Sequence, residues 1–426
     1  MIDVVELLKN NEEISDYKVI TNIKESYELF FVQDKLETVR ATNTTDCKAF
    51  VYVDHSKFRG SKAFSISNNE TVESVNEKIK DAIETAKIIN NKFYKLPANE
   101  FQDIELESNF KDYEAKELGY KIYKVVSDCA SKSKAKFNAC EIFINKHKRH
   151  IVNGSNIDKT EITYDAMIEL IPTCDLRGKG NSVELYKAIH ISKFDEEELS
   201  ATIKQSLKDV MARSRAKKPE YSINCNVILR SDEISQIISE IVYNLSYGAV
   251  YSKSNLYNLG DSIQKNAKYD LLDVTLRGQL EGSSNSHAFD SDGVSLSNCK
   301  VIYKGVAKSL YGTSQFAQYL NRKVTGDLRL IDLKKGSHSN KELKSNPYLE
   351  CVSFSGLQVD IANDYIGGEV RLANYFDGEK VHPITGISIS GKFSDVINSI
   401  KLSNKVVCES NYKGPNIALV EGFKIF

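Results

Sequence analysis

The sequence of 426 residues lacks the features that mark several large classes of protein. It has no run of about 18 apolar residues, and no basic segment followed by an apolar one at its N-terminus, so neither a membrane span nor a secretory signal is predicted. With 57 basic and 58 acidic residues the net charge is −1, which leaves no broad field to attract a polyanion or a membrane surface. We therefore expect a cytoplasmic protein that binds neither nucleic acid nor membranes.

The eight cysteines are spaced in a way that excludes the common metal and redox motifs. No two of them lie within four residues of each other, so the CxxC pair of a zinc knuckle or a thiol oxidoreductase is missing. We interpret most of them as buried thiols in a reducing compartment. The sequence also lacks a GxSxG elbow, a Walker loop, an HExxH helix and an internal repeat.

The first half of the chain alternates strand-like and helix-like segments. Residues 28–67 contain short β-rich runs with polar breaks, which is typical of an antiparallel meander, and residues 70–93 follow with apolar residues at helical spacing. A second apolar stripe in residues 112–130 precedes two strands that turn at Asn153-Gly154. Residues 195–219, acidic at their start and basic at their end, predict a closing helix.

The second half is dominated by strands punctuated by glycine. Only two helices are predicted there, one in residues 230–253 and a short one in residues 313–321. The predicted fold class is α+β, with antiparallel meanders and packed amphipathic helices in the N-terminal region and a mainly antiparallel, barrel-like β domain at the C-terminus. The predicted units are residues 1–95, residues 105–218, which are able to form one domain with the first, and residues 220–426.

The helix in residues 230–253 carries a polar group beside its apolar stripe. Glu240 and Asn244 are four residues apart and share a face, with Ser239 next to them. We expect Ser231 or Asp232 to cap the start of this helix and Gly248 to end it. Taken alone, a glutamate at the edge of an amphipathic helix is most often a solvated residue. The apolar stripe consists of Ile234, Ile237, Ile238, Ile241, Val242 and Leu245.

Two other groups of polar residues are candidate sites. The segment around His287, Asp290 and Asp292 suggests a calcium or catalytic site, but it lacks the ligand series of an EF-hand and is typical of a β-turn. The basic run from His147 to His150 favours a solvated strand surface. A local role of that run in DNA binding stays open, and such binding would weaken steeply with salt.

Four segments of the C-terminal half form a series: "SYGAVYSKSNLYNLG" from residue 246, "HAFDSDGV" from 287, "GGEVRLANYFDGEKVHPITGISISGKFSDVINSI" from 367 and "LVEGFKI" from 419. In this order they resemble the TldD/PmbA family of peptidases, formerly described as modulators of DNA gyrase. The sequence of meander, helix, second α/β unit and β-rich half also resembles that family from near residue 17 to the end.

The resemblance implies a paired enzyme. A TldD-type subunit carries an HExxxH motif on a helix, whose two histidines bind zinc with a distant cysteine while the glutamate activates a water molecule. A TldE or PmbA-type subunit lacks this motif, and pairs with TldD to enclose a cavity in which unfolded peptides are cleaved.

Aligned on Gly248, the family motif falls on Ser239, Glu240 and Asn244, so the glutamate is present and both histidines are replaced. Serine and asparagine are weak neutral ligands that do not hold zinc against cellular chelators. The chain therefore resembles the TldE or PmbA type, and Glu240 is interpreted as a vestigial general base. Together with Ser239 and Asn244 it is expected to line the substrate cavity.

The third zinc ligand of the family is also missing at its aligned position. It falls near Lys413 or Gly414, and Cys408 precedes that position by a few residues. A metal role for Cys408 is left open, although one cysteine without histidines makes a poor zinc site. We expect no cofactor in this chain and zinc in a TldD-like partner.

The leading hypothesis is thus a non-catalytic subunit that forms a heterodimer with a zinc-bearing TldD-like chain and acts on unfolded or small peptides. One alternative is a metallopeptidase that is active on its own or as a homodimer. A further alternative is a peptide-binding or regulatory module without a peptidase partner. The sequence leaves the physiological peptide and the choice between homodimer and heterodimer open.

Overall fold

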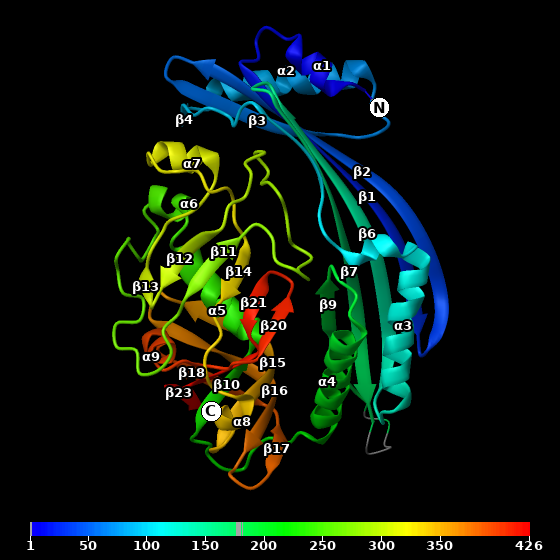
Figure 1. Ribbon diagram of the computed structural model, residues 1–426, viewed down its shortest axis with the longest axis vertical. Coiled ribbons are helices and arrows are strands. Elements are labelled where there is room, and N and C mark those ends of the chain that lie inside the picture. Colours follow the sequence, from blue (N-terminus) through cyan, green and yellow to red (C-terminus); the bar gives the residue numbers. More distant parts are fainter. Residues whose placement is uncertain (1, 176–179, 181) are drawn as a thin grey trace.

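The computed structural model describes residues 2–175, 180 and 182–426. Figure 1 shows them as two halves that follow each other along the chain, the first built on a long twisted sheet and the second on shorter strands. The helix α4 (Glu196–Arg215) ends the first half, and β10 (Asn226–Arg230) begins the second. The predicted α+β class with antiparallel sheets is confirmed, and a sheet of the C-terminal region curls into a half-barrel.

The first half contains a nine-stranded sheet of order β4-β3-β2-β1-β6-β7-β5, with β8 and β9 also paired to β7. β1 bonds antiparallel to both β2 and β6, so residues from the first two predicted units share this sheet. The predicted turn at Asn153-Gly154 is confirmed between β6 and β7. The strands are β1 (Asp16–Val32), β2 (Lys35–His55), β3 (Phe58–Ile66), β4 (Asn91–Lys92), β5 (Glu100–Glu105), β6 (Lys136–Asn153), β7 (Ile157–Cys174), β8 (Val183–Glu184) and β9 (Lys187–Ile191).

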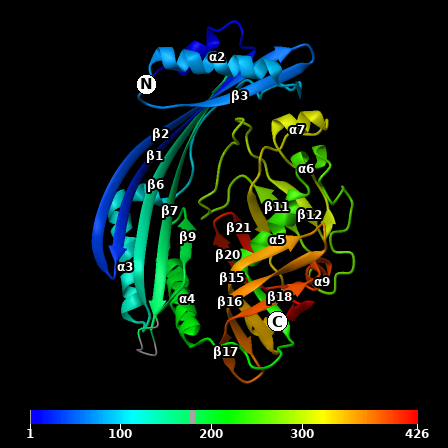
Figure 2. The ribbon, with the colours of Figure 1, turned by 180° about the vertical axis from the view of Figure 1, so that it is seen from behind.

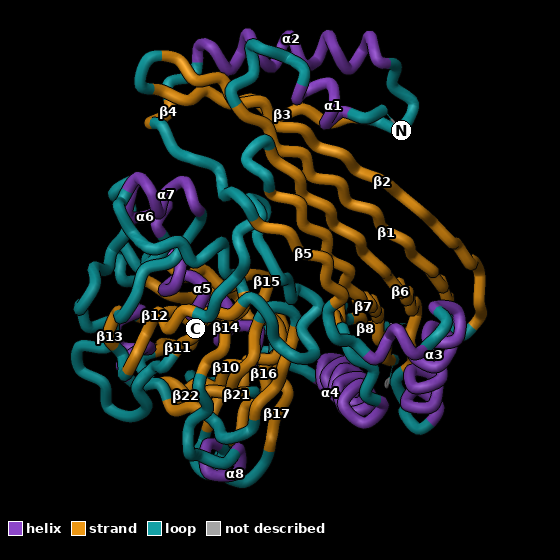
Figure 3. Tube along the Cα trace, turned by 45° about the horizontal axis from the view of Figure 1, so that its top comes forward, coloured by secondary structure: helices purple, strands orange, loops and turns teal. Residues whose placement is uncertain are grey.

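Helices cover one face of this sheet at its two ends (Figures 2 and 3). Val19 and Leu29 of β1 lie on the same face, because side chains alternate along a strand. Val19 packs with α1 (Val4–Lys9) and α2 (Val72–Ile88), and Leu29 packs with α3 (Ala115–Ser131) and α4. The predicted helices in this half are confirmed, whereas α1 was not predicted. Of the apolar residues of α2, Val72 at its start is 44% exposed.

The second half contains two sheets around one apolar core. An eight-stranded sheet has the order β19-β22-β10-β15-β16-β18-β23 with β17 on β16, and a six-stranded sheet has the order β13-β12-β11-β14-β21-β20. Its strands after β10 are β11 (Val274–Arg277), β12 (Cys299–Tyr303), β13 (Val306–Ala307), β14 (Leu330–Leu333), β15 (Tyr348–Asp360), β16 (Tyr365–Phe376), β17 (Val381–Ile384), β18 (Ile387–Gly391), β19 (Lys401–Leu402), β20 (Val406–Glu409), β21 (Tyr412–Pro415), β22 (Ile417–Val420) and β23 (Phe423–Ile425).

The helix α5 (Ser231–Tyr243) contacts strands of both sheets in this half. Its predicted apolar stripe is confirmed, since these side chains lie in the core. Three further helices were missed because their four to six residues are too few to show a helical period: α6 (Tyr247–Tyr251), α8 (Asn340–Leu343) and α9 (Phe393–Asn398). The predicted short helix is α7 (Ser314–Tyr319), and a 3-10 turn η1 (Asn109–Asp112) precedes α3.

Two properties that follow from composition can be checked against the fold. None of the eight cysteines is in a disulfide, and only Cys225 and Cys408 are not fully buried, as predicted for buried thiols. Of the helices in the described ranges, none combines the length and the apolar character that crossing a membrane requires.

A loop of the second half docks on the sheet of the first through buried charges. Glu161 of β7 is 1% exposed, and its carboxylate accepts hydrogen bonds from the backbone N–H of Ala288 at 2.8 Å and from His287 Nδ1 at 2.7 Å. Arg149 of β6 lies 2.7 Å from the same carboxylate. Beside these groups the fully buried ring of Phe289 packs with Ile151 and with its apolar neighbours in the sheet. Charge and apolar contacts together fix the loop in place.

We expect Phe289→Ala to lower the free energy of unfolding by about 3–5 kcal/mol, because it leaves a cavity where the two halves meet. Urea denaturation followed by circular dichroism measures this loss. Phe101→Ala is the matched control, since that ring is 75% exposed and its removal should cost less than about 0.5 kcal/mol. Equal losses for the two variants would show that Phe289 does not join the halves.

Candidate functional site

The face of α5 that points away from the core carries a row of hydroxyl groups. Ser231, Ser235 and Ser239 are spaced by four residues, so they follow one another along one side of the helix. All three line a cavity of about 380 Å³, which the turn between β20 and β21 closes from the other side. The lining residues are Ser231, Asp232, Ser235, Gln236, Ser239, Glu409, Ser410, Asn411 and Tyr412. We call this cavity the α5 pocket.

The α5 pocket lies near the place where the two halves of the molecule meet. Lys187 of β9, a strand of the first half, lies 3.7 Å from Asp232 at the start of α5. Ser231 donates a hydrogen bond of 2.9 Å from its hydroxyl to Glu409, which ties α5 to β20. The lining offers hydroxyls, amides and two carboxylates, a set that suits hydrogen bonding to a polar ligand such as a peptide backbone.

The start of α5 differs from the prediction. Its N-cap is Arg230, so the expectation of a cap at Ser231 or Asp232 is wrong. The Ser231 hydroxyl is engaged by Glu409 instead, and the Arg230 backbone N–H donates to the Glu233 carboxylate at 3.2 Å. Glu233 thus acts as the N3 residue of a capping box, whose carboxylate accepts from the backbone N–H of the N-cap residue.

The end of α5 also differs from the prediction, and Asn244 explains why. Its side-chain amide donates to the carbonyl of Glu240 at 2.8 Å and accepts from the backbone N–H of Leu256 at 2.9 Å. These bonds hold the chain as it leaves the helix at Tyr243, and Asn244 is the C-cap. Gly248, which we expected to end this helix, lies inside α6.

The structure separates the three residues that align with the family motif. Ser239 lines the α5 pocket, Glu240 is exposed and outside the lining, and Asn244 is 7% exposed beneath the helix end. The turn of residues 409–412, close to the position aligned with the family cysteine, lies opposite Ser239. The fold therefore brings Ser239, which stands at the first replaced histidine, close to this downstream turn. Glu240 and Asn244 do not line the pocket.

These residues do not fit a zinc ion. Both ends of the Asn244 amide are committed to the backbone, and the Ser239 hydroxyl is a weak neutral donor. Cys408 donates its thiol to the carbonyl of Glu281 at 3.4 Å, and burial raises the pKa of this thiol to about 11, so the thiolate that zinc requires is disfavoured. In residues 2–175, 180 and 182–426 no three or more His, Cys, Asp or Glu side chains cluster to hold a metal.

A network of ion pairs surrounds Arg230, the residue at the start of α5. The Arg230 guanidinium lies 2.7 Å from Asp209 and 3.1 Å from Glu350, and Lys344 lies 2.8 Å from Glu350. Burial acts to raise the pKa of Glu350, but the two cations outweigh it and hold that pKa below its ordinary value. Burial and the nearby Asp232 raise the pKa of Glu233 to about 7.

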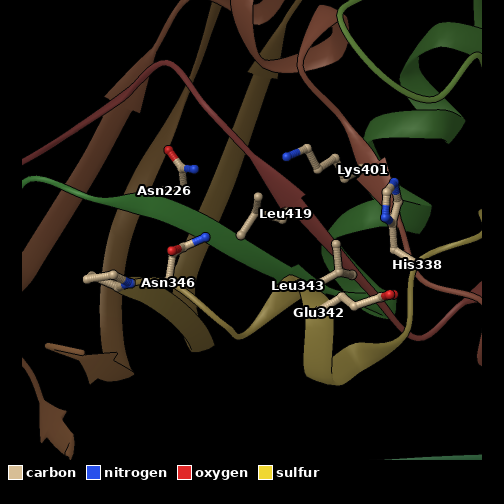
Figure 4. A pocket seen from close by; sticks show the side chains of 8 residues that line it. Asn226, His338, Glu342, Leu343, Asn346, Lys401 and Leu419 are labelled. Atoms are coloured by element: carbon tan, nitrogen blue, oxygen red, sulfur yellow. The ribbon is translucent and has the colours of Figure 1, made fainter. Parts of the chain in front are cut away.

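A second, smaller cavity does not suit a peptide. Its volume of about 90 Å³ is roughly the space of three water molecules. Asn226 and Asn346 lie on one side of it, and His338 and Glu342 lie on the other (Figure 4). A cavity of this size accommodates solvent or a small ion rather than a chain of residues.

The other candidate groups from the sequence have structural roles. Asp290 accepts hydrogen bonds from the N–H groups of Asp292 and Val294, which confirms the interpretation of this segment as a turn. The basic run of β6 faces acidic residues of β7: His147 pairs with Asp165, Arg149 with Glu161 and His150 with Asp158. The ion pair of Arg149 with Glu161 neutralises one of the two fixed positive charges in the run from His147 to His150.

With this geometry established, comparison places the second half among metallopeptidase-related domains. Residues 222–425 match the model of the PmbA/TldA metallopeptidase C-terminal domain. No curated protein matches the sequence closely enough to count as a relative. The match to this family is confined to the second half of the chain.

Three solved structures share the fold over almost the whole chain. TldE of Thermococcus kodakarensis is similar with a TM-score of 0.78 and 13% identity over 99% of each chain. A proposed modulator of DNA gyrase from Thermotoga maritima is similar with a TM-score of 0.75 and 15% identity, over 96% of each chain. A second proposed modulator of DNA gyrase, from Bacteroides thetaiotaomicron, is similar with a TM-score of 0.75 and 14% identity. The alignment covers 100% of this chain and 99% of that protein. At these identities the likeness shows the fold.

We predict that Asn244→Ala destabilises the protein by about 1–3 kcal/mol, because it leaves the Leu256 N–H without its acceptor. Glu240→Ala, on the same helix but exposed, should cost less than about 0.5 kcal/mol. Chemical denaturation of the two variants beside the parent chain measures the difference. If Asn244→Ala were as stable as Glu240→Ala, the proposed fixing of the helix end would be refuted.

Glu233 should make stability depend on pH. Its pKa is 4.5 in the reference state and about 7 in the fold, so the folded chain holds this proton more tightly and the free energy of unfolding falls as pH rises between these values. The slope from this one group is at most about 1.4 kcal/mol per pH unit. Glu233→Gln cannot ionise and should remove this part of the dependence, whereas Glu240→Gln should not. Urea titrations from pH 4.5 to 8 measure the profiles, and parallel profiles for parent and Glu233→Gln would contradict the assignment.

Proposed function

We propose that the chain is a cytoplasmic subunit of a TldD/TldE-type metallopeptidase that has no zinc centre of its own and pairs with a zinc-bearing TldD-like chain. The observation that carries this proposal is the donor set at the position of the family motif. Ser239 offers a hydroxyl in place of an imidazole, and the amide of Asn244 is committed to two backbone groups. Neither residue supplies what zinc binding requires, so the proposal assigns hydrolysis to the partner.

The α5 pocket is the proposed contact with an unfolded or small peptide. Its hydroxyls and amides provide hydrogen bonds to main-chain groups, which every peptide offers whatever its side chains. Asp232 and Glu409 add negative charge, which favours a cationic group of the peptide nearby. Glu240 has no part in this contact because it lies outside the lining.

Metal content and activity of the purified chain distinguish the proposal from a peptidase that acts alone. We expect far less than one zinc per chain and no hydrolysis of an unfolded peptide. Adding a TldD-like protein that carries HExxxH should produce hydrolysis in proportion to the amount of complex formed. Stoichiometric zinc, with hydrolysis abolished by Glu240→Gln, would reject the proposal in favour of an independently active enzyme.

A variant of the pocket separates the subunit role from a module that never joins a peptidase. Ser239→Tyr fills the α5 pocket and should lower hydrolysis by the reconstituted complex at least tenfold while the complex still forms. Glu240→Gln is the control and should leave hydrolysis unchanged, since its side chain is exposed outside the pocket. A pull-down from the native cells with a tagged form of the chain tests the pairing itself. If it recovers no HExxxH protein, the peptide-binding module is favoured instead.

A further inference from the structure

One face of the long sheet carries apolar side chains that belong to no core. Ile142 of β6 and Ile168 of β7 pack with α3 and α4. Because side chains alternate along a strand, Phe143 and Met167 lie on the opposite face, where Phe30 of β1 meets Phe143. Phe30, Phe143 and Met167 are half-buried, and none of them packs in an apolar core of the described chain. We call the surface around these three side chains the open face.

The open face already holds one guanidinium group. Arg40 of β2 stands directly opposite Glu28 of β1, and its guanidinium lies 2.5 Å from the Glu28 carboxylate. The same guanidinium lies over the ring of Phe30, 5.3 Å from the ring centre. A carboxylate beside an aromatic ring suits this group, because its planar fork pairs with oxygen atoms and its flat side stacks on the ring. Arg40 therefore shows which chemistry this surface recognises.

Two strands away, a pair of carboxylates on the open face has no cation. Glu141 of β6 stands directly opposite Glu169 of β7, and like charges in this position repel each other. Among the described residues no cation forms an ion pair with either carboxylate, and the Tyr186 hydroxyl donates to Glu169 at 2.7 Å. Burial and the charge of Glu169 raise the pKa of Glu141, and the more distant Arg40 offsets this only in part. The fold thus keeps two carboxylates together without neutralising them.

We propose that the open face binds an arginine side chain of an unfolded peptide, with the guanidinium between Glu141 and Glu169. The Cβ atoms of directly opposite residues are about 5 Å apart, so both carboxylates can reach one guanidinium. Phe30 pairs with Glu141 across β1 and β6, which sets an aromatic ring beside the carboxylates as at Arg40. The proposal extends the peptide-binding role proposed above to a second surface.

Charge complementarity selects this occupant over the alternatives. Two carboxylates without a cation attract a basic group, and the half-buried rings beside them favour a flat cation over a compact, strongly hydrated ammonium. A metal ion fits less well, since in the described part of the chain no three or more His, Cys, Asp or Glu side chains cluster to hold one. Calcium or magnesium would need about six oxygen ligands, which this apolar surface does not offer.

Peptide binding by the purified chain tests the role of the charge. A short unfolded peptide with one central arginine is compared with the same peptide carrying citrulline, which keeps the shape of arginine and lacks its charge. We expect the arginine peptide to bind about tenfold more tightly, as hydrogen bonds to charged groups provide. Fluorescence anisotropy of the labelled peptides measures both dissociation constants. Equal affinity for the two peptides, or no binding of either, would overturn the proposal.

Variants of the pair test its position. Glu141→Gln and Glu169→Gln remove one charge each with little change of shape, and each should remove most of the preference for arginine over citrulline. Glu25→Gln is the matched control, because this exposed residue of β1 lies on the opposite face of the sheet, and the preference should stay. A preference that survives both Glu141→Gln and Glu169→Gln would overturn the proposal.

Ser239→Tyr separates this surface from the α5 pocket. It fills that pocket, so it should leave the ratio of the two affinities unchanged even if both peptides bind less tightly. Loss of the arginine preference in Ser239→Tyr, with the preference intact in Glu141→Gln, would place the arginine in the α5 pocket and overturn the proposal. These measurements use the chain alone and no hydrolysis, so they fail or succeed separately from the proposed pairing with a zinc-bearing subunit.

Stability and oligomeric state distinguish a ligand site from a structural contact. Glu141→Gln relieves a contact between like charges, so it should unfold at the same urea concentration as the parent chain or a higher one. A clear loss of stability would show that the carboxylate serves the fold, which would count against the proposal. If Glu141→Gln changed the oligomeric state in sedimentation equilibrium, a second copy of the chain would be the occupant and the proposal would be wrong.

Discussion

The buried carboxylate of Glu161 is the contact on which the arrangement of the two halves depends. It is 1% exposed in the long sheet and binds Arg149 of the same sheet together with His287 and Ala288 of the second half. A buried carboxylate without partners would be very costly, so this group requires the docked loop as much as the loop requires it. Burial opposes ionisation of Glu161, but hydrogen bonding to His287 and the charge of Arg149 keep its pKa below the ordinary value.

The same docked loop brings the first half close to the α5 pocket. Loop 287–295 fixes the second half against β6 and β7, and β9, which pairs with β7, then lies near β20. Lys187 of β9 reaches toward Asp232 at the edge of the pocket. The residues that line the pocket all belong to the second half, and the first half approaches the pocket edge through Lys187.

Local sequence patterns predicted the elements that are long and periodic, and failed where partners are distant. The stripe of α5 and the stripes of α2 and α3 follow from apolar residues every three or four positions, because burial of one face dictates that spacing. Ser239 and residues 409–412 line the same cavity although they are about 170 residues apart in the sequence, and no local pattern reveals this. The family resemblance did indicate that a residue near 413 approaches this helix. It did not indicate that Glu240 lies outside the pocket.

The role of Asn244 shows why the site cannot be understood as a zinc centre with two exchanged side chains. Asparagine here satisfies a carbonyl at the end of α5 and the N–H of Leu256, so it determines how the chain leaves the helix. An imidazole at this position is larger and cannot reproduce the amide's donor and acceptor with the same spacing. Restoring histidines at 239 and 244 would therefore disturb the helix end before it created a metal site. The glutamate between them gains nothing from that change, because its exposed carboxylate is not directed at the pocket where Ser239 lies.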